Sequence, residues 1–240
     1  MASIPENTPH SRNLQVAAYR TERDLKFHEH RMLELIAENL GEFDGRLIDV
    51  GCASGTFLGA LRQRFPAARL EGLELDEEMI ALAEKRLAGK DVNIIKGDAF
   101  GFKPAAPYDA VMASGIFSVF EDPLSALENW VSWLKPEGVL FIFTQFNTRD
   151  FDTRVYYRSH YNPQGWETGL SSYAIRTVSK FLDELGCTYT FERFHIPIDI
   201  PESDDPCRSY TVTLDNGERM ILYGGSIVSE QFFLTVRRKT

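Results

Sequence analysis

The chain has 240 residues, of which 43% are hydrophobic and 25% are charged, a composition typical of a soluble globular protein with one large domain. Asp and Glu outnumber Lys and Arg by 35 to 26, for a formal net charge of −9. This balance disfavours a nucleic-acid partner, since such proteins need a basic surface. The N-terminus lacks an apolar signal segment, and no apolar run of about 18 residues occurs. We therefore expect a cytoplasmic protein without a membrane span.

The three cysteines, Cys52, Cys187 and Cys207, are odd in number and form no C-x-x-C pair. Neither a disulfide framework nor a zinc site is indicated, and we expect no metal. Reduced thiols agree with a cytoplasmic location.

The N-terminal part predicts a helical cap segment over residues 1–44, because apolar side chains recur at helical spacing between residues 20 and 40. The remainder, 45–240, predicts one α/β domain. Strands are expected at 46–51, 69–75, 92–96, 108–114 and 138–146, and helices at 55–64, 77–88 and 123–134. Strands that alternate with helices form a parallel sheet covered on both faces, so we expect a Rossmann-like three-layer sandwich.

Two insertions interrupt this alternation. Residues 146–170 are rich in arginine and aromatic residues and have no clear period. A helix is expected at 171–186. The second insertion, 196–225, contains Asn216–Gly217 between two apolar runs, which is a strong signal for a β-hairpin. A final strand is expected at 230–238.

The stretch LIDVGCASGTFL, residues 47–58, joins the first strand to a helix through a glycine loop. Glycine lets the backbone approach a ligand closely, and N–H groups at a helix start suit a polar or negative ligand group. The loop contains Asp49, Gly51 and Gly55, but Ala53 stands where the fingerprint G-x-G-x-x-G has its middle glycine. The pattern therefore predicts a nucleotide-type cofactor, and it disfavours a pyrophosphate and an NAD-dependent oxidoreductase.

Acidic residues also end the next two strands, Glu74 in EGLELDEEMI and Asp98 in KGDAF. Glu74 is placed to accept both hydroxyls of a ribose, and Asp98 is placed to accept from an adenine amino group. The plainer alternatives are an exposed strand end for Glu74 and a helix or turn cap for Asp98. With Asp49, these residues put three carboxylates on the carboxyl edge of the sheet, where open α/β sheets bind ligands.

These motifs, with YDAVMASGIFSVFEDP and LKPEGVLFIFT, resemble in order those of class I S-adenosylmethionine-dependent methyltransferases over residues 45–146. The resemblance implies a seven-stranded, mostly parallel sheet whose last strand, 230–238, runs antiparallel between its neighbours. It implies S-adenosyl-L-methionine as cofactor and S-adenosyl-L-homocysteine as product. The residues that it assigns to the cofactor are Asp49, Gly51, Cys52, Ala53 and Gly55 near the methionine part, Glu74, Leu75 and Met79 near the ribose and adenine, Asp98, Ala99 and Phe100 near the base, Ser114 and Gly115 near the sulfonium, and Tyr19 and Arg23 in an N-terminal lid.

Two features depart from parts of this superfamily. Val119, in SGIFSVFEDP, occupies the place where many small-molecule members have a histidine, so one ready general base is missing. The run ASGIF replaces the D/N-P-P-Y-like tetrapeptide of nucleobase amino methyltransferases. A DNA adenine methyltransferase is therefore disfavoured.

The acceptor is expected to bind at the two insertions, because arginines can hold a phosphate or carboxylate and aromatic side chains can enclose a small ligand. The candidate acceptor residues are Asn147, Arg149, Arg154, Tyr157, Arg158, Trp166 and Arg208, and the candidate bases are His160 and His195. The alternative is an ordinary surface insertion whose arginines pair with Asp150, Asp152 and Glu167.

The favoured function is methyl transfer to an oxygen or nitrogen atom of a small polar acceptor, with a phosphate- or carboxylate-bearing metabolite or sugar as the main hypothesis. The C-terminal third is similar to bacterial methyltransferases that modify surface polysaccharides or small metabolites. The alternatives are an inactive methyltransferase-fold partner subunit and a tRNA or rRNA methyltransferase. A homodimer is a further expectation.

Overall fold

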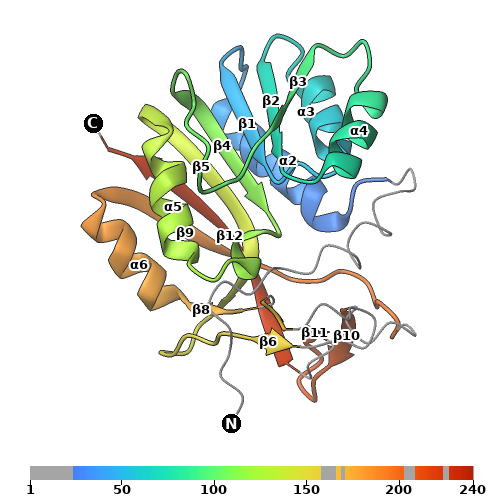
Figure 1. The fold of residues 1–240 in the computed structure, drawn as a ribbon. Helices are drawn as coiled ribbons and strands as arrows, with labels where there is room; N and C mark the ends of the chain where they lie inside the picture. Colours follow the sequence, from blue (N-terminus) through green and yellow to red (C-terminus); the bar gives the residue numbers. More distant parts are fainter. Residues whose placement is uncertain (1–23, 158–165, 169–170, 203–208, 224–226, 240) are drawn as a thin grey trace.

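The computed structural model describes residues 24–157, 166–168, 171–202, 209–223 and 227–239. Figure 1 shows one twisted sheet with helices packed against it. None of the helices in these ranges is long and apolar enough to span a membrane.

Helices and strands alternate through the first part of the described chain, as the sequence predicts. In chain order the main elements are α2 (Phe27–Leu40), β1 (Arg46–Val50), α3 (Thr56–Arg64), β2 (Arg69–Glu74), α4 (Glu77–Arg86), β3 (Val92–Lys96), β4 (Tyr108–Ser114), the 3₁₀ turn η1 (Phe117–Val119), α5 (Pro123–Ser132), β5 (Leu134–Asn147), α6 (Ile175–Glu184), β9 (Cys187–Phe194) and β12 (Ile227–Arg238). The shorter strands are β6 (Tyr156–Tyr157), β7 (Glu167–Thr168), β8 (Tyr173–Ala174), β10 (Tyr210–Thr213) and β11 (Arg219–Tyr223).

The central sheet has the strand order β3–β2–β1–β4–β5–β12–β9. The strands from β3 to β5 are parallel, whereas β12 is antiparallel to both β5 and β9. This confirms the prediction of a mostly parallel sheet whose last strand runs antiparallel between its neighbours. Since β1 and β4 are neighbours, the strand order reverses between them, which is where open α/β sheets place their ligands.

The sheet is larger than the seven strands predicted, because the insertions add to it. The hairpin around Asn216–Gly217 is confirmed as β10 and β11. It is not a separate unit, since β11 pairs with the first residues of β12, for example Tyr223 with Ile227. β12 therefore begins at Ile227 rather than at residue 230. With β8 paired to the end of β5, the described residues form a ten-stranded sheet.

Two apolar layers join the helices to the sheet. One contains Trp130 of α5 and Val178 of α6, and the other contains Ile36 of α2 and Leu58 of α3. All four side chains are completely buried, and burial of a side chain of this kind stabilises the fold by about 1.5–3 kcal/mol. As a result α2 is fixed against the sheet, and its first turn lies near the carboxyl ends of the strands.

The start of α2 differs from the sequence prediction. The helix begins at Phe27 instead of residue 20, and residues 20–23 lie outside the described part of the chain. Lys26 is extended, with φ −72° and ψ 159°, and its N–H donates to a carboxylate oxygen of Glu29 at 2.7 Å. This bond satisfies an N–H group just before the helix and fixes the side chain of Glu29 at the helix start.

Candidate functional site

The loop between β1 and α3 has a conformation that small residues tolerate best. Gly51 and Gly55 have φ angles of 74° and 72°, and a Cβ atom on Gly51 would lie 2.8 Å from Cγ2 of Ile116. Ala53 also has a positive φ, 47°, which is uncommon for a residue with a side chain. The N–H of Gly51 donates to the carbonyl of Leu73 at 2.8 Å. The loop is therefore joined to the end of β2.

Glu74 strengthens this junction with its side chain. Its Oε2 accepts a hydrogen bond from the N–H of Ala53 at 2.9 Å. Its Oε1 accepts from the N–H groups of Leu75 and Asp76 at 2.7 and 2.9 Å. A carboxylate offers about four acceptor positions, so Oε2 keeps capacity for a further donor such as a ribose hydroxyl. The side chain predicted to bind the cofactor thus also holds the loop in place.

Asp49, at the end of β1, is a buried carboxylate with 4% of its surface exposed. Its pKa is raised well above the usual 3.8 by burial and by the nearby charges of Glu29 and Glu74. No N–H or O–H group of the described residues donates to its carboxylate. A buried carboxylate is unfavourable unless it is paired, so this position suits a cationic ligand group. Burial and Asp49 also raise the pKa of Cys52, which keeps it a neutral thiol.

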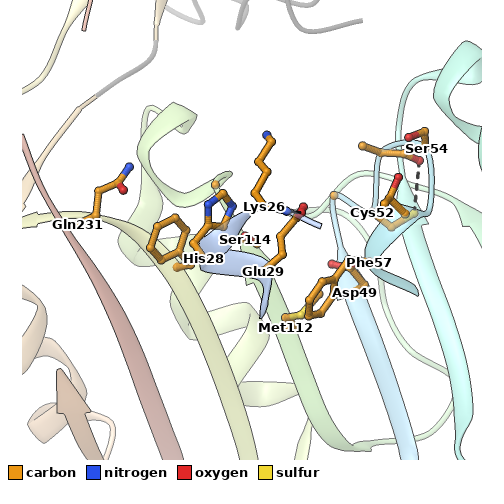
Figure 2. A pocket seen from close by; sticks show the side chains of 15 residues that line it. Lys26, His28, Glu29, Asp49, Cys52, Ser54, Phe57, Met112, Ser114 and Gln231 are labelled. Carbon is orange, nitrogen blue, oxygen red and sulfur yellow. Dashed lines mark hydrogen bonds between the residues drawn. The ribbon is translucent and has the colours of Figure 1, made fainter. Parts of the chain in front are cut away.

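A cavity of about 190 Å³ lies over the ends of β1, β4 and β5 and reaches β12 (Figure 2). Six predicted cofactor residues line it: Asp49, Gly51, Cys52, Ala53, Ser114 and Gly115. Gly115, with φ 76°, has no atom within 4 Å of where a Cβ atom would lie. The structure therefore brings the glycine loop and the turn after β4 together around one space.

Sequence reasoning missed the other residues that line this cavity: Lys26, His28, Glu29, Ser54, Thr56, Phe57, Met112, Phe143 and Gln231. One of them carried a usable signal. Glu29 lies three and seven residues before Met32 and Ile36, on the buried face of α2, and a Glu on an apolar helix face is rarely buried without a reason. His28 and Gln231 carry no comparable local pattern.

The residues predicted for the ribose and adenine lie mainly at the ends of β2 and β3. The predicted cofactor residues that are described but do not line the cavity are Gly55, assigned to the methionine part, and Glu74, Leu75, Met79, Asp98, Ala99 and Phe100. Met79 is buried and Leu75 is 42% exposed. The exposed Asp98 accepts a hydrogen bond from the N–H of Phe100 at 2.7 Å, as in the turn-cap alternative. Its second oxygen leaves a position for a ligand donor.

Some of the predicted acceptor and lid residues lie outside the described part of the chain: Tyr19, Arg23, Arg158, His160 and Arg208. The others are described, but none of them lines the cavity. Arg149 and His195 are exposed, as is Trp166 at 39%. Asn147 builds a turn, because its Oδ1 accepts from the N–H of Arg149 at 3.0 Å. Tyr157 lies in β6.

Arg154 and the two aspartates of the first insertion have partners close to α6. Tyr173 raises the pKa of Arg154, and Arg154 partly offsets the rise that burial causes in the pKa of Tyr173. Asp150 pairs with Arg176 of α6 at 2.9 Å, and Asp152 accepts from the N–H of Ala174 at 2.8 Å. Among the described residues, these two carboxylates therefore bind α6 and its start. Their predicted pairing with Arg158 stays a prediction, because that arginine lies outside the described residues.

The residues around the cavity fit S-adenosylmethionine. The buried carboxylate of Asp49 suits an ammonium group, and Glu74 and Asp98 end the neighbouring strands β2 and β3. At about 190 Å³, the cavity is smaller than the roughly 300–1,000 Å³ of pockets that enclose a drug-sized ligand. It would hold the methionine part, with the nucleoside over the ends of β2 and β3.

The known sequences to which this chain is similar are methyltransferases. Residues 21–191 match a family model described as a methyltransferase domain. The chain is 29% identical over 130 residues to malonyl-[acyl-carrier protein] O-methyltransferase of Halalkalibacterium halodurans, a match that covers 51% of this chain and 48% of the relative. It is 29% identical over 159 residues to trans-aconitate 2-methyltransferase of Escherichia coli O157:H7, with 65% and 61% covered. The chain thus spans about half to three fifths of these relatives' length.

Solved structures share the fold over almost the whole chain. The amino pentose methyltransferase CalS10 from Micromonospora echinaspora, solved with S-adenosylmethionine bound, has a TM-score of 0.58 at 20% identity and covers 98% of this chain and 100% of its own. YcgJ of Bacillus subtilis has a TM-score of 0.62 at 14% identity, with 88% and 99% covered. Because the family model spans well over half of the sequence and the glycine loop has the geometry described above, the chain belongs to the family of S-adenosylmethionine-dependent methyltransferase domains.

Proposed function

We propose that this protein transfers the methyl group of S-adenosylmethionine to an oxygen or nitrogen atom of a small polar acceptor that carries an anionic group. The polarity of the cavity carries this proposal (Figure 2). The carboxylates of Asp49 and Glu29 lie on the side of the glycine loop, whereas His28 and Gln231 lie toward β12. A cationic cofactor suits the first end, and an acceptor with an anionic group suits the second.

The main contribution of the protein is alignment. The bound cofactor supplies a methyl group on a positively charged sulfur, which is already an activated leaving group. The residues that line the cavity would hold the cofactor so that its methyl group could pass to the acceptor atom, with the electron pair of the broken carbon–sulfur bond left on sulfur. Holding the reacting atoms in line can supply about 7–11 kcal/mol of the barrier. Phe57, Met112 and Phe143 line the cavity and limit the access of water.

The need for a base depends on the acceptor. A carboxylate attacks without losing a proton, whereas a hydroxyl needs a base in the transition state. His28 is the one histidine of the described residues that lines the cavity, and Val119 stands where related enzymes have a histidine. An acceptor that is already ionised agrees with this arrangement, because it removes the requirement for a dedicated base.

The relatives and the net charge support a small acidic acceptor. Malonyl-[acyl-carrier protein] and trans-aconitate, the compounds in the names of the two relatives, both contain carboxylate groups. The net charge of −9 disfavours an RNA acceptor, because a polyanion needs a basic surface.

Calorimetric titration with S-adenosylmethionine and S-adenosylhomocysteine tests the cofactor half of the proposal. A transfer assay with methyl-labelled cofactor then tests the acceptor half against dicarboxylates, sugar phosphates, uncharged alcohols and amines, and tRNA. We expect micromolar binding of both cofactor forms and transfer to anionic small molecules. Failure to bind either form would favour an inactive partner subunit. Transfer only to uncharged acceptors or to tRNA would refute the anionic acceptor.

A further inference from the structure

Part of the first insertion lies beside the turn that follows β4. Thr153 pairs with Ser172 through two main-chain hydrogen bonds of 2.7 and 2.9 Å. The N–H of Ser171 in turn donates to the carbonyl of Ser118 in η1 at 3.0 Å. η1 begins two residues after Gly115, which lines the cavity. Only one hydrogen-bonded segment therefore separates this part of the insertion from the turn after β4.

Further contacts fix the chain next to Arg154. The N–H of Val155 donates to the hydroxyl of Ser171 at 3.1 Å. The hydroxyl of Tyr156 lies 3.5 Å from a carboxylate oxygen of Glu121, which follows η1. Figure 1 shows β6 and β8 near the end of β5. The main chain that carries Arg154 is therefore held at the carboxyl end of the sheet by contacts with two separate segments.

The guanidinium of Arg154 has tyrosine neighbours and no carboxylate partner. Tyr173 and Tyr156 lie next to it and raise its pKa. Tyr173 is 4% exposed, and its buried hydroxyl has no hydrogen-bond partner among the described residues. No ion pair joins Arg154 to a carboxylate in the described part of the chain. Since Arg154 is exposed, its positive charge is available to a ligand.

The nearby carboxylates are bound to other donors. Burial raises the pKa of Tyr173, and the charges of Asp152 and Asp122 add to the rise, so both carboxylates lie near this side chain. Asp152 accepts two hydrogen bonds at the start of α6, of 2.8 and 3.1 Å. Asp122 accepts from the N–H and the hydroxyl of Ser125 at the start of α5, at 3.2 and 2.6 Å. Their charges disfavour a phosphate dianion at Arg154 more than they disfavour a carboxylate, which carries one charge.

We infer that Arg154 binds a carboxylate of the acceptor that does not itself receive the methyl group, and that Tyr173 is a positioning residue for its guanidinium. This inference rests on the proposed function and adds the residue that selects the acceptor and the group that it recognises. A guanidinium presents a planar fork of donors that matches the two oxygens of a carboxylate. With one carboxylate held at Arg154, another polar group of the same small molecule can reach the methyl group beside Ser114 and Gly115.

This assignment leaves the cavity over the glycine loop to the methionine part of the cofactor. Arg154 does not line that cavity. The ring of its neighbour Tyr173 lies 6.1 Å from that of Phe117 in η1, within the apolar layer that contains Trp130. Phe143, which lines the cavity, belongs to the other layer. Cofactor and acceptor carboxylate thus lie on opposite sides of the turn after β4, an arrangement that suits attack in line with the bond to sulfur.

The test uses the full chain saturated with S-adenosylhomocysteine, which is titrated calorimetrically with malonate, trans-aconitate and uncharged dimethyl malonate. Arg154→Gln removes the positive charge, Arg154→Lys returns the charge without the planar fork, and Tyr173→Phe removes only the hydroxyl. The matched control is Arg176→Gln, because the guanidinium of this nearby arginine already pairs with Asp150 at 2.9 Å. Thermal denaturation of each variant checks that it is folded.

We expect Arg154→Gln to weaken the binding of malonate and trans-aconitate about tenfold or more, while the affinity for S-adenosylhomocysteine stays within about twofold. Arg154→Lys should regain part of the loss, since it restores the charge but not the fork. Tyr173→Phe should weaken binding about threefold, because the guanidinium is then less well fixed. Arg176→Gln should change neither affinity, and dimethyl malonate should bind more weakly than malonate.

Unchanged carboxylate binding in Arg154→Gln would overturn the inference, and unchanged binding in Tyr173→Phe would overturn the role given to that residue. An equal loss in Arg176→Gln would report only the charge of the surface and would also overturn the inference. The same holds for a wild-type complex that binds neither malonate nor trans-aconitate, or that binds dimethyl malonate as tightly as malonate. A wild-type chain that does not bind S-adenosylhomocysteine would instead refute the proposed function, so the two failures are distinguishable.

Discussion

Replacing Glu74 by glutamine separates its shape from its charge. The carboxylate accepts hydrogen bonds from the N–H groups of Ala53, Leu75 and Asp76. Glutamine has nearly the same shape, but only one of its two terminal atoms can accept. If the oxygen stays with Leu75 and Asp76, the amide nitrogen faces the N–H of Ala53. That orientation keeps two bonds and is preferred over the reverse, which keeps one.

The size of the effect follows from the lost bond to Ala53. A hydrogen bond to a charged group contributes about 1.5–3 kcal/mol. Because Glu74 is half-buried, we use the lower part of that range, about 1.5–2 kcal/mol. For a domain of this size, 1 kcal/mol corresponds to about 2–4 °C in melting temperature, so a decrease of about 3–8 °C is expected. The released Ala53 no longer fixes the glycine loop, and the affinity for S-adenosylhomocysteine should fall about tenfold or more.

The assays are thermal denaturation and calorimetric titration with S-adenosylhomocysteine. The control is Glu71→Gln, on the same strand, whose carboxylate binds Arg46 at 2.8 Å and does not contact the glycine loop. It should lower the melting temperature and leave the affinity unchanged. A Glu74→Gln variant that melts like the wild type and binds within twofold of it would refute this account of the loop. An equal loss of affinity in Glu71→Gln would show that the effect is not local.

Three further substitutions test separate parts of the site. Arg86→Gln removes a guanidinium that donates to the carbonyl and hydroxyl of Ser54 in the glycine loop; calorimetry should show about tenfold weaker binding of S-adenosylhomocysteine, but little change for 5′-methylthioadenosine, which lacks the amino-acid part. Asp49→Asn should remove a pH dependence. Burial raises the pKa of Asp49 above 3.8, so the folded protein binds this proton more tightly than the unfolded chain, and stability is lost as the pH rises from 3.8 through the raised pKa. Denaturant titrations across this pH range should show the loss in the wild type and not in the variant. Arg31→Met breaks two bonds to Glu192, of 2.8 and 2.9 Å, that join α2 to β9; since both side chains are partly exposed, the free energy of unfolding should fall by only about 0.5–1 kcal/mol, as measured by denaturation at low salt.

Each of these predictions has its own contradicting result. Arg62→Gln is the control for Arg86, because its guanidinium also binds main-chain carbonyls, of Pro66 at 2.8 Å and Asp91 at 2.7 Å, but none in the glycine loop. Equal losses for the two nucleoside ligands would contradict the role given to Arg86. Parallel pH profiles of wild type and variant would contradict the assignment to Asp49. A loss for Arg31→Met that salt does not reduce would mean that its side chain stabilises α2 by packing and not by charge.

The parallel half of the sheet could be predicted because each strand has a local signal. The strands at Val92–Lys96 and Tyr108–Ser114 have the bounds expected from the apolar runs. The two-residue strands β6, β7 and β8 could not be predicted, since two residues have no period. β8 exists because Tyr173 and Ala174 lie against the end of β5, a contact between distant segments. The same contact delays the start of α6 to Ile175.

The two ends of the cavity also differ in whether a local sequence signal predicts them. The glycine loop is contiguous, so Asp49, Gly51 and Ala53 could be assigned from one stretch of sequence and lie together in the structure. The far end joins His28 to Gln231, which are about two hundred positions apart and meet only because α2 and β12 pack on the same sheet. A pattern within one segment cannot report such a meeting, whereas the arginine-rich insertion is contiguous and therefore carries the stronger signal in the sequence.

Because the two ends have separate supports, they should respond independently to substitution. The loop depends on Glu74 and the junction with β2, whereas His28 depends on its stack with Phe143. Substitutions with no shared partner usually add within about 0.3–0.5 kcal/mol. The double variant Glu74→Gln, His28→Phe should therefore lose stability by the sum of the two single losses, and its affinity for S-adenosylhomocysteine should equal that of Glu74→Gln alone. A coupling beyond about 0.5 kcal/mol in either measurement would mean that cofactor and acceptor ends move as one unit, and that neither could be assigned its ligand from its own contacts.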